Sequence, residues 1–544
     1  MAISKTTTTG WYTRITLKGT ARTMNRLKKL FSGADPAVLG LGFILLLEYA
    51  YIFLFLLNYH MAWMNGENFA THAWSLSNGK QWRWEDFGRG FNIDVLELGA
   101  PRFSRLISVF FELVNAKFRA YCWNFFPPHP SLSCLWPLFF AGVPFFLFKF
   151  FRNMGCGQVV ALSGIALYLA SIGFLAPVVM LFHPAKSMVN FFAAVVLFTG
   201  SRIYRKSLDT GRGASVKNIP YFWFDYAVFL FFMLGAFFSD ETGLFVYVIA
   251  AFMFYPVFFR FKERFFILGS YVLLPAVYVL AIYVVLPRIY MVKLSNWFYT
   301  PSPFDLFSPD WRHFWTNFFW LSSDHPHIEL NPGHVFVANK TLFFVQGVYT
   351  FVLFFILFSF IRAGARNLRP WIIQVMTGAA LVMAYVYFFT FQLSRNAKVW
   401  GVWWYGSLYS LVYFIVLTFV LQFILEGKGG ALFKRFFVFI VFIMVVHGMA
   451  FSTYRVDIFA GSRRLNYLKE EVFTGKIDKF YKNFSFTGSV EKSRCRYFYT
   501  VSVWARVKQK KLDPATLAQI DGCRETLARD AAFPEEAQYL AIEL

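Results

Sequence analysis

Residues 38–58 read VLGLGFILLLEYAYIFLFLLN, an apolar run long enough to cross the hydrocarbon core of a bilayer as one helix. Comparable runs recur along the chain and are continuous, whereas the strands of an outer-membrane barrel alternate apolar and polar residues. We therefore expect an all-α polytopic membrane protein. About eleven spans are expected, near 38–58, 134–151, 158–182, 188–204, 220–238, 243–259, 265–287, 342–361, 371–392, 403–425 and 436–452.

The composition of the 544 residues agrees with this class. The chain is 57% hydrophobic and 15% charged, whereas a soluble domain is usually about 25% charged. This composition excludes an intrinsically disordered chain and disfavours a soluble enzyme. The net charge of +23 does not indicate a nucleic-acid-binding surface, because many of the cations lie in short loops between apolar runs. We expect membrane lipids as partners and no nucleic acid.

The cations are concentrated in alternate loops, which is the pattern that marks cytoplasmic loops. It predicts a cytoplasmic N-terminus and an outer C-terminus, with charges at the span ends and His447 as the main exception within a span. A long polar arm precedes the first run, so no cleavable signal peptide is expected. The expected parts are a cytoplasmic basic arm (1–37), a transmembrane module (38–452) with outer loops at about 60–133 and 288–341, and an outer C-terminal domain (453–544).

This topology is typical of a bacterial inner membrane protein whose chemistry faces the periplasm, or of an ER membrane protein in a eukaryote. In both cases the outer cysteines meet an oxidising compartment. Cys495 and Cys523 are therefore candidates for a disulfide in the C-terminal domain, with free buried thiols as the alternative. No pair of cysteines has the C-x-x-C spacing, so neither a zinc ribbon nor a dithiol redox motif is indicated.

The first outer loop carries the densest set of polar and aromatic residues. It contains Trp82-Arg83-Trp84-Glu85-Asp86, then Asn92-Ile93-Asp94-Val95-Leu96-Glu97, then Pro101-Arg102-Phe103-Ser104-Arg105. An amphipathic stretch follows at 106–125, too short and too interrupted by charge to span. We expect it to form a helix that lies on the outer membrane interface.

Two adjacent acids, Asp240 and Glu241, follow the fifth expected span within Ser239-Asp240-Glu241-Thr242-Gly243. Charges at the membrane edge are costly unless they line a cavity or bind a ligand. Two interpretations stay open for this pair. It forms either an ordinary solvated turn or an acidic group directed into a cavity on the outer face.

The layout resembles the GT-C superfamily of membrane glycosyltransferases, and within it the protein O-mannosyltransferase-like branch. The resemblance covers roughly residues 38–290 and rests on three short motifs. These are Pro101-Arg102-Phe103-Ser104-Arg105-Leu106 before an interfacial helix, His183-Pro184 after the third span, and Ser239–Gly243 after the fifth. One feature differs: the family often carries an Asp-Asp pair soon after the first span, where this chain has only Glu67. The base must then come from later in the loop, or the chain has lost activity.

The resemblance implies a sugar donor linked to polyprenyl phosphate or diphosphate, and an acceptor protein or glycan on the outer face. Inverting transfer needs one carboxylate base for the acceptor and cations for the departing phosphate. For the base we rank Asp94 first and Asp86 second, with a solvated loop acid as the alternative for each. Arg102 and Arg105 are the candidates for the phosphate, with lipid-headgroup anchoring as the alternative.

Further candidates surround this set. Trp82 and Trp84 are placed to stack on a sugar ring, while Arg395 and Lys186 are second phosphate contacts or part of an interfacial belt. The second outer loop carries Asp324, His325 and His327, which have the chemistry of metal ligands but more often form a polar loop. We expect no required cofactor and no metal.

Two other classes of function compete with the enzyme. A lipid or glycolipid flippase, or a transporter, would show interrupted spans and charges near the membrane midplane. A non-catalytic GT-C-like scaffold subunit would explain the missing Asp-Asp pair.

Overall fold

The computed structural model describes residues 35–58, 106–122, 135–179, 184–210, 213, 215–240, 242–289, 407–425, 430–460, 511 and 514–523. These residues form helices joined by turns, with no strand among them. The expectation of an all-α chain is confirmed over this part of the sequence. The expected spans at 342–361 and 371–392 lie outside the described residues.

Most apolar runs fold as single helices at the expected positions. The seventh run is nearly continuous, with a π-helical turn (Ala281–Val285) between α13 (Arg264–Leu280) and α14 (Leu286–Ile289). The other single helices are α2 (Pro36–Asn58), α7 (Trp136–Asn153), α10 (Pro184–Asp209), α11 (Phe222–Phe237), α12 (Gly243–Phe258), α18 (Ser407–Leu425) and α19 (Ala431–Ala460).

Three described segments are long and apolar enough to cross a bilayer: Pro36–Leu54, Ser187–Leu208 and Leu432–Ala450. Shorter apolar segments lie in α8 (Gln158–Leu169), α11, α13 and α18. The first and last of the three, in α2 and α19, expose much of their length, and the exposed side chains are large and apolar. Such surfaces suit lipid and not water. The chain is therefore a membrane protein.

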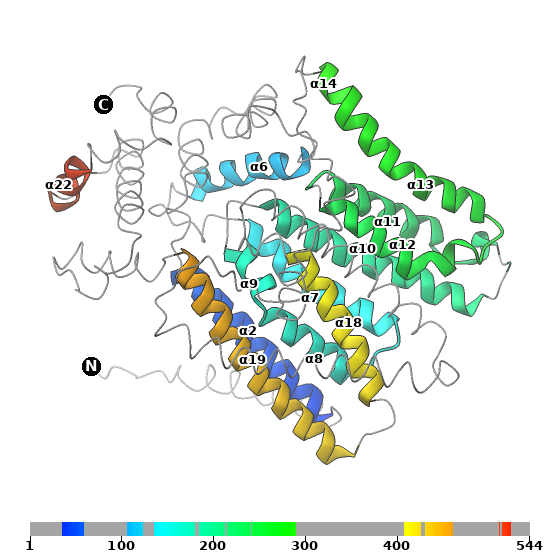
Figure 1. Cartoon of the computed structure of the whole chain (residues 1–544), viewed down its shortest axis with the longest axis horizontal. Helices are drawn as coiled ribbons and strands as arrows, with labels where there is room; N and C mark the ends of the chain where they lie inside the picture. Colours follow the sequence, from blue (N-terminus) through cyan, green and yellow to red (C-terminus); the bar gives the residue numbers. More distant parts are fainter. Residues whose placement is uncertain are drawn as a thin grey trace, which may run out of the picture.

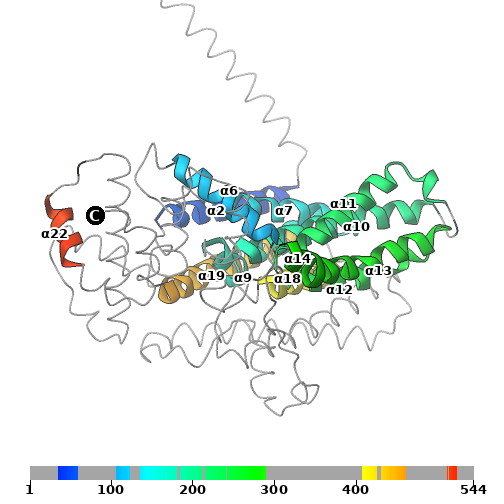
Figure 2. The same ribbon diagram turned by 90° about the horizontal axis from the view of Figure 1, so that it is seen from above.

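α10 lies at the centre of the bundle and packs against α7, α11 and α12. Seen from above, the helices form two layers, with α2, α7, α10 and α11 in one and α19, α18, α12 and α13 in the other (Figure 2). α2 and α19 form one flank, and α13 forms the opposite flank (Figure 1). The amphipathic stretch forms α6 (Leu106–Cys122), which lies across the end of the bundle rather than along it (Figure 1).

The bundle has two chemically different ends. At one end, here named the basic end, Arg202, Lys206, Arg260 and Lys434 lie close to the helix termini. The other end, here named the Asp240 end, carries the turn between α11 and α12 and the first residues of α6. Arg202, Lys206, Arg260 and Lys434 thus gather at one end of the bundle, and the Asp240 turn lies at the other.

An ion cluster holds the basic end together. Asp225 on α11 is buried, and its carboxylate lies 2.8 Å from the Lys206 ammonium and 3.3 Å from the Arg202 guanidinium, both on α10. Nearby, Glu263 accepts hydrogen bonds from the Ser215 hydroxyl (2.5 Å) and from the backbone N–H of Val216 (3.0 Å). These bonds connect the α10–α11 loop to the α12–α13 loop.

The third apolar run departs from expectation. It was expected as one span over 158–182, but its helix is not continuous: α8 (Gln158–Leu169) ends, and α9 (Ile172–Val179) begins after Ala170 and Ser171. The Ser171 hydroxyl bonds to the carbonyl of Tyr168 at 2.6 Å and lies 3.3 Å from the N–H of Phe174, so it caps the new helix. Ser452 on α19 donates to the Ala170 carbonyl at 2.7 Å, which satisfies a carbonyl at the break.

Within the segment expected to form the C-terminal domain, the structure describes one short helix, α22 (Pro514–Gly522), which has proline at its first position. Cys523 follows it, is buried and is disulfide-bonded. Cys495 lies outside the described residues, so the pairing with Cys523 stays a prediction. Cys122, at the end of α6, is a free thiol.

Candidate functional site

The turn between α11 and α12 is compact and its polar groups are buried. Oδ1 of Asp240 accepts hydrogen bonds from the backbone N–H of Thr242 (3.0 Å) and from its hydroxyl (2.7 Å). The Ser239 hydroxyl donates to the carbonyl of Gly235 at 2.6 Å. These short local bonds are typical of an Asx turn, and they hold the Asp240 carboxylate in one orientation. The interpretation of Asp240 as a fully solvated acid is wrong, because its side chain is buried.

The last residue of this motif is a glycine for a steric reason. A methyl group built on Gly243 would lie 1.9 Å from the carbonyl oxygen of Ala236, which is backbone and cannot move aside. The close approach of the two helices therefore requires glycine at this position. The sequence Ser-Asp-Glu-Thr-Gly thus encodes a tight turn, whatever else Asp240 does.

α6 docks directly onto this turn. The N–H of Ile107, in the first turn of α6, donates to the carbonyl of Phe238 at 2.8 Å. Further along, Oδ1 of Asn115 accepts from the backbone N–H of Leu135, just before α7, at 2.8 Å. The ring of Phe111 packs edge-on against Phe139 of α7 at 5.1 Å between centroids. The first of these contacts joins segments that are more than a hundred positions apart in the sequence, whereas the other two hold α6 against α7.

The site residues proposed from the sequence divide into two groups. Asp240 is described, and Lys186 lies in the first turn of α10, although the position of its side chain is not described. Arg105 directly precedes α6 in the sequence. The residues that lie outside the described part are Trp82, Trp84, Asp86, Asp94, Arg102, Arg105, Glu241, Asp324, His325, His327, Arg395 and Cys495.

Asn190 is a polar residue that the sequence analysis missed. It lies one helical turn after Lys186 on α10, is fully buried, and neither its amide oxygen nor its amide nitrogen has a hydrogen-bond partner. A methyl group on Gly235 of α11 would meet Phe192 of α10 at 3.2 Å, so these two helices are closely packed here. Because they are antiparallel, Asn190 lies at about the level of the Asp240 end. A lone amide within an apolar run was the available signal.

A second missed residue is Glu48, in the middle of α2. The expectation that charges lie at span ends with His447 as the main exception is wrong, because Glu48 lies within the first span and is 3% exposed. Neither of its carboxyl oxygens has a hydrogen-bond partner. A buried ionisable group inside a membrane span is costly and usually functional.

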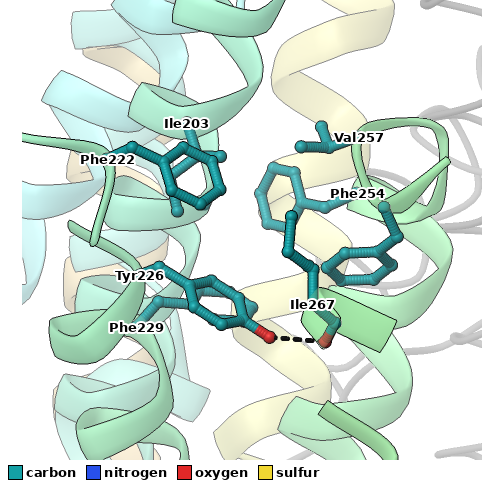
Figure 3. Close-up of a pocket in the computed structure, with 9 residues that line it drawn as sticks. Ile203, Phe222, Tyr226, Phe229, Phe254, Val257 and Ile267 are labelled. Atoms are coloured by element: carbon teal, nitrogen blue, oxygen red, sulfur yellow. Dashed lines mark hydrogen bonds between the residues drawn. The ribbon is translucent and has the colours of Figure 1, made fainter. Parts of the chain in front are cut away.

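A small cavity near the basic end has a mainly apolar lining. Helices α10, α11, α12 and α13 line it, and Tyr226 donates to the carbonyl of Ile267 at 2.7 Å on its wall (Figure 3). Its other lining side chains are apolar and include Phe222, Phe229 and Phe254. It offers no charged group to a phosphate, so we do not place the chemistry there.

Metal ligands do not gather in the described part of the chain, where no group of three or more His, Cys, Asp or Glu side chains occurs. The loop with Asp324, His325 and His327 lies outside this part. Comparison with known proteins identifies no relative: no family model, no curated protein and no solved structure matches this chain.

Proposed function

We propose that this chain is a membrane glycosyltransferase of the GT-C type, which moves a sugar from a polyprenyl-phosphate-linked donor to an acceptor protein or glycan on the outer face. One observation supports this most directly: α6 is hydrogen-bonded to the turn that carries Asp240, through Ile107 and Phe238. The segment that ends in Arg105 leads directly into α6. The contact thus brings the helix that follows one of the three motifs to the turn that carries another.

In this proposal each residue has a chemical role. Asp94, or else Asp86, deprotonates the acceptor, while Arg102 and Arg105 hold the departing phosphate through charge-assisted hydrogen bonds. Trp82 and Trp84 stack on the sugar. Lys186 and Arg395 are further phosphate contacts, and Glu241 is a second cavity acid beside Asp240. Asp240 acts as a positioning residue, because its hydrogen bonds to Thr242 shape the turn that receives α6.

We also propose that the basic end faces the cytoplasm and the Asp240 end faces the periplasm, or the ER lumen in a eukaryote. The cluster of described cations at the basic end supports this orientation through the positive-inside pattern. It puts α6 and the Asp240 turn on the face where lipid-linked sugars and their acceptors would meet.

The test is consumption of a panel of polyprenyl-linked sugars by the purified protein in lipid vesicles. We expect Asp94→Asn to lower turnover by about 10²–10⁴-fold, the usual contribution of a general base. Asp86→Asn should lower turnover only if Asp86, and not Asp94, is the base. Donor binding and the melting temperature should stay unchanged, which separates chemistry from folding. Asp35→Asn, at the opposite end, is the matched control and should retain wild-type turnover.

If the wild-type protein consumes no donor in the panel, the enzyme proposal is wrong. If it does, but both aspartate variants match it, the base lies elsewhere and Glu67, Glu97 and Glu241 are the next residues to replace.

A second candidate function is transport or flipping of a lipid or glycolipid. The observation that favours it is the interruption of the third span at Ala170–Ser171, together with a carboxyl group within the first span. Interrupted helices and midplane charges are typical of secondary transporters. Vesicles that move a fluorescent lipid-linked sugar between leaflets, without consuming it, would support this function over glycosyl transfer.

A further inference from the structure

Glu48 lies on the buried stripe of α2. The stripe consists of Leu41, Ile44, Glu48, Ile52 and Leu56, which recur every three to four residues and face the neighbouring helices. Four of these five side chains are apolar, and the fifth is a carboxyl group. Substituting an acid into such a stripe is unfavourable, so its presence requires an explanation other than packing.

The ionisable groups around Glu48 lie on α2 itself and on the helices that contact it. α2 packs against α8 and α19, and Tyr49 of α2 also reaches the backbone of Ala141 on α7 at 3.4 Å. Lys434 and Arg435 lie at the basic end of α19, about 20 Å along the helix axis from the level of Glu48. The titratable or charged residues of these elements are Tyr49 and Tyr51 on α2, Tyr168 on α8, Lys149 and Arg152 on α7, and Lys434, Arg435, His447, Tyr454, Arg455 and Asp457 on α19.

Contacts between α2 and α19 show where Glu48 lies along the axis of the bundle. The Lys434 ammonium lies 3.6 Å from the Asp35 carboxylate, and the Tyr51 hydroxyl donates to Thr453 at 3.0 Å. The two helices are therefore parallel and in register, which places Glu48 level with the segment around Gly448. A methyl group on Gly448 would lie 3.0 Å from the Cβ of Ala170.

Glu48 is consequently level with the break between α8 and α9. Two further polar groups on the adjacent helices lack partners: the Tyr168 hydroxyl, at the end of α8, and Nε2 of His447, on α19. The buried carboxyl, the interrupted helix and these two unsatisfied groups thus occur at one depth in the membrane. Polar groups placed together at midplane depth are typical of proton and ion pathways.

The residues around Glu48 suit a proton better than a metal cation as its ligand. A metal cation needs several oxygen ligands to replace its water, whereas no hydrogen-bonding group of the described residues reaches either oxygen of Glu48. The Ala170 carbonyl at the break is already bonded by Ser452. A proton needs no second ligand, because it converts the carboxylate into a neutral acid that is far less costly to bury.

We propose that Glu48 is a proton-binding site within the membrane. Its carboxylate accepts a proton from a hydronium ion, which leaves as water, and the reverse step returns the proton. The Tyr168 hydroxyl and Nε2 of His447 are the other unsatisfied polar groups at this depth on the neighbouring helices. This inference does not depend on the glycosyltransferase proposal, since it concerns a different depth and different residues.

The test uses the full-length protein in lipid vesicles and dicyclohexylcarbodiimide, an apolar reagent that modifies protonated carboxyl groups in membranes. Peptide mapping by mass spectrometry should find the adduct on Glu48 at about pH 5 and find it decreasing towards about pH 10, a range that brackets known buried carboxyls. Glu48→Gln should lose the adduct, whereas Glu263→Gln, which removes a carboxyl from the basic-end loops, should retain it.

Infrared spectroscopy provides a second measurement that does not need a variant to fold. The carbonyl band of a protonated acid should be present in the wild-type protein and should shift when the vesicles are moved into D₂O. An absent adduct at every pH, an adduct that does not change with pH, or a band that does not shift in D₂O would overturn the proposal.

Discussion

Asp225, Asp240, Glu263 and Glu48 are accommodated in different ways. Asp225 is neutralised by two cations, Asp240 is bonded within its own turn, and Glu263 binds a backbone N–H and a hydroxyl. Glu48 has none of these partners. The first three therefore contribute to structure in ways that can be measured, and the fourth is the exception to explain.

Replacing Asp225 with Asn should destabilise the protein by about 1.5–3 kcal/mol, the usual contribution of a hydrogen bond to a charged group. The side chain is 1% exposed, so water cannot replace the lost contacts with Arg202 and Lys206. The measurement is the melting temperature of the purified protein in detergent.

The control for this variant is Asp35→Asn. The Asp35–Lys434 pair is largely exposed and its atoms are 3.6 Å apart, so its loss should cost less than about 1 kcal/mol. Asparagine also keeps the oxygen that accepts from the N–H of Ala37 at the start of α2. Equal losses in the two variants would contradict the assignment of Asp225 as the main ion-pair contact at the basic end.

Glu263 should make stability depend on acid pH. The hydrogen bonds from Ser215 and from the backbone of Val216 lower the pKa of Glu263 below its usual value of 4.5. Stability from these bonds is fully present above that usual value and is lost as the pH falls through the lower, folded-state pKa. The melting temperature of Glu263→Gln should therefore fall less than that of the wild-type protein between about pH 5 and about pH 3. If the melting temperatures of the two proteins fall in parallel with pH, Glu263 contributes nothing to the pH dependence of stability.

At the scale of elements, close contact between small residues holds α8 against α18. A methyl group on Gly164 would lie 1.9 Å from Oγ1 and 2.9 Å from Cβ of Thr418. The hydroxyl of Thr418 already donates to the carbonyl of Phe414 at 2.6 Å, so it is not free to turn away without cost. Small residues at such crossings are typical of helices that associate within membranes.

Gly164→Ala should therefore destabilise the protein by about 1–3 kcal/mol, the usual cost of overpacking. Gly42→Ala is the matched control, because a methyl group there meets nothing within 4 Å. It should be neutral or slightly stabilising, since alanine favours helix over glycine. Thermal melting of both variants in the same detergent measures the difference. Equal melting temperatures would mean that α8 can move away from α18.

The positions of the helices can be predicted from the sequence, because a span of about twenty apolar residues is the main physical requirement for crossing a bilayer. The break in the third run cannot be predicted in this way. Ala170 and Ser171 carry no strong helix-breaking signal, and the bond that satisfies the break comes from Ser452, which is 282 positions away. A break that depends on a distant helix leaves little trace in the local sequence.

The sequence predicts only part of the candidate site, because single polar residues within long apolar runs are easily missed. The sequence predicts a helix within 106–125, which is found as α6, and it singles out Asp240, but the hydrogen bond that joins α6 to the Asp240 turn is known only from the structure. Glu48 and Asn190 are missed because one polar residue barely changes the mean hydropathy of a long run. The structure makes each of them stand out through its burial and its lack of hydrogen-bond partners.

At the scale of the whole molecule, the two ends of the bundle should label from opposite sides of the membrane. Lys217 lies in the exposed loop at the basic end, and Lys511 lies in the C-terminal domain. A membrane-impermeant maleimide should modify Lys217→Cys only in inverted vesicles and Lys511→Cys only in right-side-out vesicles. The wild-type protein gives the background from the native cysteines. Labelling of both variants from one side would contradict the proposed orientation.

The parallel pairing of α2 with α19 has a consequence for biogenesis. The hydrogen bond between Tyr51 and Thr453 joins residues 402 positions apart. At about 5–20 residues per second, a ribosome needs roughly 20–80 s to make that length of chain. During this interval the first helix has no α19 beside it, so that part of its surface must face lipid, another helix or the insertion machinery. We expect nascent chains truncated before residue 431 to remain associated with the insertase and to be degraded faster than the full-length protein.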